Sequence, residues 1–310
     1  MCLKREALER IRSIFGDRVR LNEPMALHTS FRIGGPADLY AVATSARELV
    51  ELISLAEEHQ IPYLIIGRGT NILVSDKGIR GLVIESRAQG VRFEGDAIVH
   101  AESGVLLGDL AYESARRGLG GLEWAVGIPG SVGGAIVGNA GAYGGYIGDV
   151  VWKATVLKAN GIVHELSVKE LGFGYRTSRF KEQGIGDRGR EVILSAEFAL
   201  HPEPVEMLIA KMADYTRRRE AKQPTEPSAG SVFKRTERYP AGFLIEQAGL
   251  KGKRIGDAQI SPKHANFIVN LGRAKASDVK ALIDLAQETV FEEFGEKLEL
   301  EIELVGEWER

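Results

Sequence analysis

The chain has 310 residues, with 40 Lys and Arg against 43 Asp and Glu, which gives a formal net charge of −3. Hydrophobic residues make up 44% and charged residues 27%, as in an ordinary globular protein, and the length suggests about two domains. The near-neutral charge disfavours a nucleic-acid or membrane-surface protein, which usually carries a basic stripe. The single cysteine, Cys2, excludes an internal disulfide and indicates a reducing compartment. Neither a signal-peptide core nor an apolar run of roughly 18 residues occurs, so we expect a soluble cytoplasmic protein.

Strand and helix patterns alternate irregularly along the chain. Ser45 and Glu48 form a capping box that predicts the start of a helix. Further helices are predicted at residues 205–222 and at residues 277–294, where Gly295 follows as the C′ residue. This mixture favours an α+β fold over a doubly wound parallel sheet. Strands are predicted at residues 63–66, 81–86, 97–102, 151–158, 191–200 and 298–305.

Glycine is concentrated in one segment, residues 118–148, which holds twelve of the 37 glycines. Because glycine loses much backbone entropy on folding, this density indicates backbone at positive φ or pressed close to another group. A flexible linker would explain the glycines but not the interleaved Trp124, Ile136 and Tyr143. We therefore predict that this segment cradles a ligand.

Residues 67–71, with the sequence Gly-Arg-Gly-Thr-Asn, follow a predicted strand, where a phosphate-binding turn could lie. They do not form a Rossmann fingerprint, because Ile72 replaces the last glycine and a strand, not a helix, follows. No Walker A pattern occurs either. If a dinucleotide binds, backbone amides of residues 67–71 and 130–134 are expected to hold its pyrophosphate. Each loop alone is equally compatible with a tight structural turn.

The sequence has no pattern typical of metal or serine-hydrolase catalysis. Its six histidines form no i, i+4 pair and no Cys/His cluster, so no metal site is predicted. A G-x-S-x-G nucleophile elbow is also missing. Catalysis is therefore expected to depend on an organic cofactor.

Three polar positions stand out, each with two interpretations. Arg176 lies between aromatic residues, where a guanidinium could hold a carboxylate or form an ordinary surface salt bridge. Ser231 follows a glycine, where its hydroxyl could be exposed at a turn or bond its own backbone. Glu301 shares the polar face of the last predicted strand with Glu299 and Glu303, which is typical of a solvated sheet face. The residues alone leave these alternatives open.

Together these segments resemble the UDP-N-acetylenolpyruvoylglucosamine reductases, flavoenzymes that complete UDP-N-acetylmuramate for peptidoglycan. Almost the whole chain is covered, in order, and the length resembles the shorter subtype without the inserted tyrosine loop. The resemblance implies the FAD-binding fold of vanillyl-alcohol-oxidase-type flavoproteins, which accounts for the missing Rossmann motif. The matching segments are residues 28–38, 67–78, 121–144, 175–181, 222–224, 227–234, 258–270 and 298–308.

The resemblance also implies three domains. Residues 1–86, joined by the C-terminal strand 300–310, and residues 87–215 are the two FAD-binding subdomains. Residues 216–299 are the substrate-binding domain, which closes over the substrate.

The implied reaction is the NADPH-dependent reduction of UDP-N-acetylglucosamine enolpyruvate through FAD, with hydride delivered to the enolpyruvyl methylene carbon. Arg176 and a protonated Glu301 are then expected to stabilise the enolate that develops on the carboxylate side. Ser231 is expected to protonate the adjacent carbon as general acid, polarised by Lys234 or by a proton relay. Tyr175 and Lys234 are implied to contact the substrate.

FAD is expected to bind noncovalently, because no His or Cys occurs in residues 61–80 or 118–148. Arg235 and Asp257 depart from the family pattern at positions expected near the substrate diphosphate. The alternatives are a flavin oxidase of the same fold and a nucleotide-sugar-binding protein without catalysis. No nucleic acid, membrane or obligate protein partner is expected. The residues implied to bind FAD are Gly67, Arg68, Gly69, Thr70, Asn71, Gly130, Ser131, Gly133, Gly134, Asn139 and Gly141.

Overall fold

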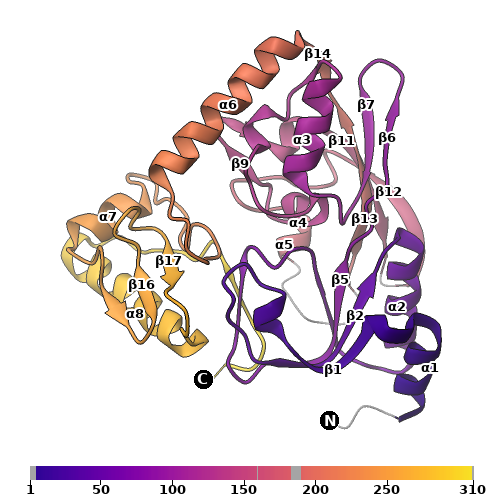
Figure 1. Ribbon diagram of the computed structural model, residues 1–310, viewed down its shortest axis with the longest axis horizontal. Coiled ribbons are helices and arrows are strands. Elements are labelled where there is room, and N and C mark those ends of the chain that lie inside the picture. The colour runs from indigo at the N-terminus through magenta and orange to yellow at the C-terminus, as the bar shows by residue number, and fades with distance from the viewer. Residues whose placement is uncertain (1–4, 159, 183–189, 309–310) are drawn as a thin grey trace. The chain divides into compact units, whose positions relative to one another are not determined.

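The computed structural model describes residues 5–158, 160–182 and 190–308, and Cys2 lies outside them (Figure 1). The described chain falls into two compact units, and it passes between them several times. Unit 1 comprises the described residues up to Leu21 together with Leu39–Arg68 and Gly81–Arg218. Unit 2 comprises Asn22–Asp38, Gly69–Arg80 and the described residues from Arg219 onward.

The first sheet has the strand order β1-β2-β5-β3, and β3 runs parallel to β5. Two amphipathic helices cover its apolar residues, and together they enclose a buried cluster that includes Leu39, Leu52 and Ile84. The predicted strand at Tyr63–Ile66 is confirmed, and the one at residues 81–86 begins slightly earlier. The elements are β1 (Val19–Pro24), β2 (Pro36–Ala43), β3 (Tyr63–Ile66), β5 (Ile79–Ser86), α1 (Arg5–Phe15) and α2 (Ala46–Glu58).

The second sheet is antiparallel and lies in unit 1, with the order β12-β11-β13-β7-β6 and with α3 and α4 on one face (Figure 1). Sequence periodicity identified the three inner strands but missed the two edge strands, β6 and β12, most of whose residues are not buried. The elements are β6 (Val91–Glu94), β7 (Ile98–Glu102), β11 (Val151–Leu157), β12 (Val163–Ser167), β13 (Val192–Ala199), α3 (Leu107–Arg116), α4 (Val132–Val137) and α5 (Arg179–Glu182).

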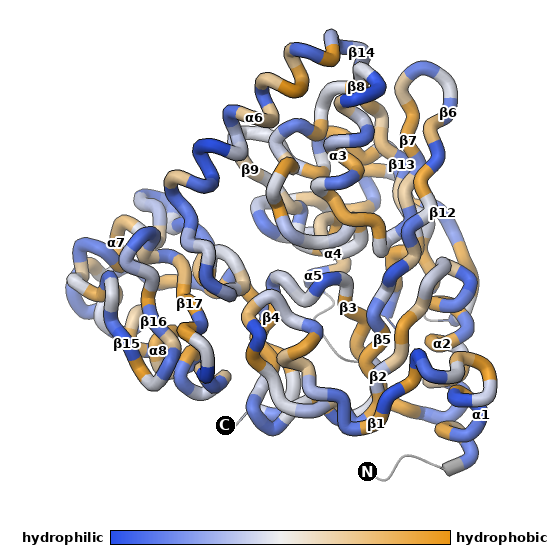
Figure 2. Tube along the Cα trace, in the orientation of Figure 1, coloured by the Kyte–Doolittle hydropathy of each residue, from blue (hydrophilic) through white to orange (hydrophobic). Residues whose placement is uncertain are grey.

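The long helix α6 spans Val205–Lys222, as predicted. Figure 2 shows hydrophilic residues along its C-terminal half, where Arg217 and Arg218 are exposed. Its N-terminal half buries Leu208 and Met212 against the second sheet's cluster. Short pairs complete unit 1: β8 (Leu119–Gly120) with β14 (His201–Pro202), and β9 (Gly141–Ala142) with β10 (Gly145–Tyr146).

Unit 2 packs two helices on a small antiparallel sheet of order β15-β16-β17. The predicted helix at residues 277–294 is confirmed with an earlier start at Ala276, and Gly295 ends it with φ of 67°. Such a left-handed conformation favours glycine. The elements are α7 (Ala241–Gln247), α8 (Ala276–Phe294), β15 (Arg254–Ile255), β16 (Ala258–Ile260) and β17 (Ile268–Asn270).

The predicted C-terminal strand is shorter than expected. Only β18 (Glu303–Val305) is a strand, and it pairs in parallel with β4 (Ile72–Val74). The residues before it pair instead with another segment, because Leu300 forms a bridge with Phe233 and Lys234 N–H donates to the Glu299 carbonyl at 2.8 Å. Residues 298–305 thus pair first with the segment at Phe233 and then with β4. The apolar alternation is present, but the residues do not form one continuous strand.

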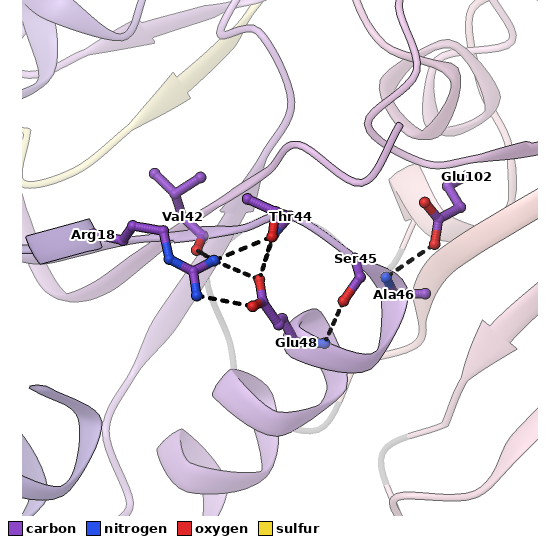
Figure 3. Close-up of polar contacts among 7 residues, drawn as sticks. All are labelled: Arg18, Val42, Thr44, Ser45, Ala46, Glu48 and Glu102. Carbon is purple, nitrogen blue, oxygen red and sulfur yellow. Dashed lines mark hydrogen bonds and ion pairs between the residues drawn. The ribbon is translucent and has the colours of Figure 1, made fainter. Parts of the chain in front are cut away.

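The start of α2 is capped as predicted on one side and differently on the other (Figure 3). Ser45 Oγ accepts the Glu48 N–H at 3.2 Å. The Glu48 carboxylate accepts the Thr44 N–H at 2.7 Å, and Arg18 donates to both its oxygens at 2.6 and 2.8 Å. A capping box would have the Glu48 carboxylate accept the Ser45 N–H. It accepts the N–H of the preceding residue, Thr44, instead. The Arg18 hydrogen bonds, as the largest cause, lower the pKa of Glu48 to about 2.

We expect Glu48→Gln to destabilise the protein at neutral pH and to have a smaller effect near pH 3. A carboxyl whose pKa is lowered by folding stabilises fully above its unfolded pKa, near 4.5, and loses this contribution as pH falls towards 2. Since the Arg18 and Glu48 side chains are 36% and 25% exposed, solvent screening limits the effect to about 1 kcal/mol. Urea unfolding at neutral pH and near pH 3 measures it, with Glu51→Gln on the same helix as control. An equal loss at both pH values would contradict this assignment.

Candidate active site

The glycine-rich segment is folded into defined turns and is no linker. Gly130 has φ of 143° and Gly121 has φ of 120°, conformations that side chains rarely adopt. Elsewhere the backbone is pressed against aromatic rings, since a Cβ on Gly145 would collide with the Trp124 indole. Both reasons predicted for the glycine density, positive φ and close approach, are confirmed here.

The two predicted phosphate loops meet in unit 1. A Cβ on Gly67 would collide with Ser131 Oγ, so the end of β3 lies directly against the start of α4. Ser131 is 2% exposed and caps α4, where its Oγ accepts the Gly134 N–H at 3.5 Å. The Gly133 N–H donates to the Ser103 carbonyl at 2.9 Å, and a Cβ on Gly133 would come within 3.0 Å of Ser103 Cβ. A side chain at Gly133 would therefore crowd Ser103.

Gly134 differs from its neighbour. A Cβ there would meet only Ser131 Oγ, at 3.7 Å, which is ordinary contact. Its φ is not positive, and it lies within the helix α4, where alanine is favoured over glycine by about 1 kcal/mol. Neither packing nor conformation in this chain requires glycine at this position. The open space beside it fits the close approach of a ligand.

The second half of the first loop belongs to unit 2, where it is bonded to the segment that carries Glu301. The Asn71 side-chain amide donates to the Glu301 carbonyl at 3.1 Å, and the Glu303 N–H donates to the Asn71 carbonyl at 2.9 Å. Gly69 adopts φ of 58°, and Thr70 lies between it and Asn71. In unit 1, the half-exposed Arg68 lies 3.7 Å from the buried carboxylate of Glu85.

Arg176 lies at the tip of a tight turn in unit 1, between Gly174 and Thr177, which form a bridge. Its φ is 55°, and its Nη2 donates to the Gly141 carbonyl at 2.8 Å. The guanidinium carbon lies 5.8 Å from the ring centre of Tyr175, which is half exposed. The predicted catalytic arginine is thus bonded directly to a predicted FAD-binding residue.

Asn139 ties that turn to the glycine-rich segment. Its Nδ2 donates to the Gly174 carbonyl at 2.8 Å, and its Oδ1 accepts the Gly148 N–H at 3.0 Å. It is buried and has φ of 42°. Asn139 therefore joins the two loops, and these bonds occupy both ends of its side chain.

Ser231 and Glu301 lie on neighbouring extended segments of unit 2. Ser231 forms a bridge with Phe267, and the Glu301 N–H donates to the carbonyl of Val232 at 2.8 Å. Asn266 fixes the same segment, because its side chain accepts the Phe233 N–H at 3.0 Å and donates to the Phe233 carbonyl at 2.8 Å. The structure thus brings two predicted catalytic residues together within one unit, while Arg176 belongs to the other.

Lys234 forms an ion pair with Glu299, its Nζ lying 3.3 Å from the carboxylate. The lysine side chain is 25% exposed and the glutamate 74% exposed, so the pair lies at the surface. Asp257, one of the departures from the family pattern, forms an ion pair with Arg254 and accepts the Arg273 N–H at 3.1 Å. The Asp257 carboxylate therefore bonds residues of unit 2 on both sides of it in the sequence.

Two serines hold the predicted cofactor loops in place but were not predicted from the sequence. The Ser103 carbonyl accepts the Gly133 N–H, and the Ser103 hydroxyl lies 2.9 Å from the hydroxyl of Ser86. Ser30 bonds the Gly69 carbonyl through its N–H at 3.1 Å. Both serines are distant in sequence from the residues they hold. The only available signal was that Ser30 lies in the first matching segment, residues 28–38.

No group of three or more His, Cys, Asp or Glu side chains within the described residues could hold a metal ion. Within the same residues, no helix combines the length and the apolar character needed to cross a membrane.

Comparisons with known proteins agree over nearly the whole chain. The family model for the FAD binding domain matches residues 37–167, and that for the UDP-N-acetylenolpyruvoylglucosamine reductase C-terminal domain matches residues 223–305. The UDP-N-acetylenolpyruvoylglucosamine reductase of Alkaliphilus oremlandii is 47% identical over 294 residues, which cover 94% of each chain. That of Agathobacter rectalis is 48% identical over 301 residues, or 93% of this chain and 94% of the relative.

The fold is also shared with a solved structure. The crystal structure of UDP-N-acetylenolpyruvylglucosamine reductase from Thermus caldophilus superposes with a TM-score of 0.77 at 36% identity, covering 92% of this chain and 97% of that one. The prediction of an α+β FAD-binding fold with a C-terminal α+β domain is thereby confirmed.

Proposed function

The chain belongs to the UDP-N-acetylenolpyruvoylglucosamine reductase family of FAD-dependent oxidoreductases, and we propose that it reduces UDP-N-acetylglucosamine enolpyruvate to UDP-N-acetylmuramate for peptidoglycan synthesis. NADPH is the proposed reductant. The observation that carries the proposal is the pairing of the Ser231 and Glu301 segments in unit 2, because it places a hydroxyl and a carboxyl on adjacent backbone. The proposed compartment is the cytoplasm, on the strength of the single cysteine.

The residues at the start of α4 fit FAD. Gly67 and Ser131 bring two loops into contact, and the space beside Gly134 is open. The N–H groups of Val132 and Gly133 already donate to backbone carbonyls of the protein. We therefore propose that the other residues in the ranges 67–71 and 130–134 contact the phosphates. FAD bound here would supply the redox chemistry for hydride transfer between NADPH and the substrate. We propose that it is held noncovalently.

Gly134→Ala should weaken FAD binding by more than about tenfold while leaving the apoprotein as stable or up to about 1 kcal/mol more stable. The added methyl group meets no protein atom closer than 3.7 Å, so it obstructs only the ligand. Flavin fluorescence quenching measures affinity, and urea unfolding of the apoprotein measures stability.

Gly133→Ala is the matched control for this substitution. Its Cβ would lie 3.0 Å from Ser103 Cβ, so we expect a loss of apoprotein stability. Unchanged FAD affinity in Gly134→Ala would show that the open space does not receive the cofactor.

Each proposed catalytic side chain has a distinct task. Arg176, always protonated, and Glu301, in its acid form, stabilise the negative charge that develops on the lactyl carboxylate side. Ser231 donates its hydroxyl proton to the carbon next to that carboxylate. Tyr175 and Lys234 are proposed to contact the substrate. Since Lys234 is paired with Glu299, it has to exchange that surface partner for the substrate.

The three-domain division is proposed on the same basis. The buried residues form three clusters, one around the first sheet, one around the second sheet and one around α7 and α8. The proposed division has two FAD-binding subdomains, residues 1–86 with 300–310 and residues 87–215, and a substrate-binding domain, residues 216–299. The cluster around α7 and α8 also takes in Phe31, Ile33, Leu73 and Ile302 of the first subdomain.

An anaerobic titration of the FAD-loaded protein tests the function directly. Adding NADPH should bleach the flavin absorbance, and adding UDP-N-acetylglucosamine enolpyruvate should restore it. Recovery only on admission of air would favour an oxidase with another substrate. Absence of flavin binding, even after FAD is added, would overturn the proposal.

A further inference from the structure

One residue of unit 2, Ser30, bonds two segments that the proposed chemistry uses separately. Its N–H donates to the carbonyl of Gly69, in the cofactor loop, at 3.1 Å. Its hydroxyl donates to the carbonyl of Ser228, three residues before Ser231, at 2.7 Å. The hydroxyl oxygen also lies 3.4 Å from the Gly69 carbonyl, too far for a second strong bond. Both of its donor groups are therefore directed at these two segments.

The turn that carries Ser30 is well fixed. Thr29 Oγ1 donates to the Ile33 carbonyl at 2.9 Å, and the next side chain, Phe31, is fully buried. The Asn270 side chain also donates to the Phe31 carbonyl at 3.0 Å. A residue held in this way can serve as a fixed point for the two segments it bonds.

Between Ser228 and Val232, the Ala229 side chain is buried and Ser231 forms a bridge with Phe267. Gly230 lies in the middle of this segment with φ of 76°, and a Cβ there would meet no atom within 4 Å. Beyond it, the Val232 N–H donates to the Asn266 carbonyl at 2.8 Å. The path of Ser231 is therefore set by the Phe267 bridge and the Val232 bond on one side, and on the N-terminal side by the buried Ala229 and the bond from the Ser30 hydroxyl to Ser228.

We infer that Ser30 is a positioning residue that couples the cofactor loop to the place of Ser231. Ordering of Gly69 by the cofactor is transmitted through the N–H and hydroxyl of Ser30 to Ser228, and from there across Gly230 to the proton donor. This inference rests on the proposed function, because it takes Ser231 as the donor. It assigns Ser30 no contact with substrate or cofactor.

Hydrogen exchange of the protein with and without FAD, in the absence of substrate, tests the coupling. In the unmodified protein, FAD should slow exchange both in the loop at residues 67–71 and at residues 229–233. In Ser30→Ala, FAD should still protect the loop, because the Ser30 N–H remains, while its effect at residues 229–233 should disappear. Persistence of that distant protection in Ser30→Ala would overturn the inference.

The half-reactions give a second measure. Ser30→Ala should leave flavin reduction by NADPH unchanged and slow reoxidation by substrate about tenfold or more, since a small displacement of a catalytic group has effects of this size. Ser30→Thr keeps the hydroxyl and should restore the rate. Ser54→Ala is the matched control, because Ser54 also donates to a carbonyl, that of Val50 at 2.8 Å, on the exposed face of α2. Equal slowing of both half-reactions, or no rescue by threonine, would indicate a general structural defect.

The two proposals can fail separately. If the unmodified protein binds FAD but is not reoxidised by the enolpyruvyl substrate, the proposed function is wrong. If it is reoxidised, and Ser30→Ala behaves as the unmodified protein does, only the coupling is wrong.

Discussion

Replacing Ser231 with alanine should leave flavin reduction by NADPH intact and slow reoxidation by the enolpyruvyl substrate by about 10²- to 10⁴-fold, the contribution typical of a positioned general acid. The proton that completes the product comes from this hydroxyl, and hydride transfer without it leaves an unquenched enolate. The substitution should not disturb the fold, because the segment is fixed by main-chain bonds, including the bridge from Ser231 to Phe267. The two half-reactions therefore separate cleanly.

Anaerobic stopped-flow measurements of flavin absorbance follow each half-reaction. Ser231→Cys is the informative companion, since a thiol is a stronger acid than a hydroxyl and should recover part of the rate with an altered pH dependence. Urea unfolding should give the same stability for all three proteins within about 0.5 kcal/mol. If alanine slows both half-reactions equally, Ser231 is not the proton donor.

Local sequence signals predicted the elements that local interactions determine. The helix α6 and the end of α8 at Gly295 follow from apolar spacing and from a glycine in left-handed backbone. The glycine density of residues 118–148 predicted positive φ and close packing, and both occur. Such features need no knowledge of the rest of the chain.

Features that depend on distant segments were not predictable. The strand expected at residues 298–305 is divided because Leu300 pairs with Phe233 while Leu304 pairs with Leu73 of β4. The cap of α2 differs because Arg18, far away in sequence, binds Glu48. The same holds for Ser30, whose two partners lie in separate parts of the chain. Sequence periodicity describes one segment at a time, so it cannot indicate which segments meet.

Replacing Arg176 with alanine should slow substrate reoxidation by about 10²- to 10³-fold, the cost of removing one preorganised group that stabilises developing negative charge. The structure prepares this arginine for the task. It holds the backbone at φ of 55°, and Nη2 donates to the Gly141 carbonyl at 2.8 Å. Arg176→Lys keeps the charge but loses the planar fork, so we expect a rate between those of the unmodified protein and the alanine variant.

Arg176→Ala also removes the hydrogen bond to the Gly141 carbonyl, which could loosen the proposed FAD-binding segment. The affinity for FAD measures this second effect independently. We expect that affinity to fall by less than about tenfold, because the β9–β10 pair that contains Gly141 is also held by Asn139, whose Oδ1 accepts the Gly148 N–H at 3.0 Å. Arg179→Ala is the matched control: this nearby arginine binds the Glu191 carboxylate at 2.9 Å and the Glu170 carbonyl at 3.2 Å. It should lower stability slightly and leave both half-reactions unchanged. If Arg176→Ala behaves in the same way, Arg176 is an ordinary surface arginine, and the enolate must be stabilised by other groups.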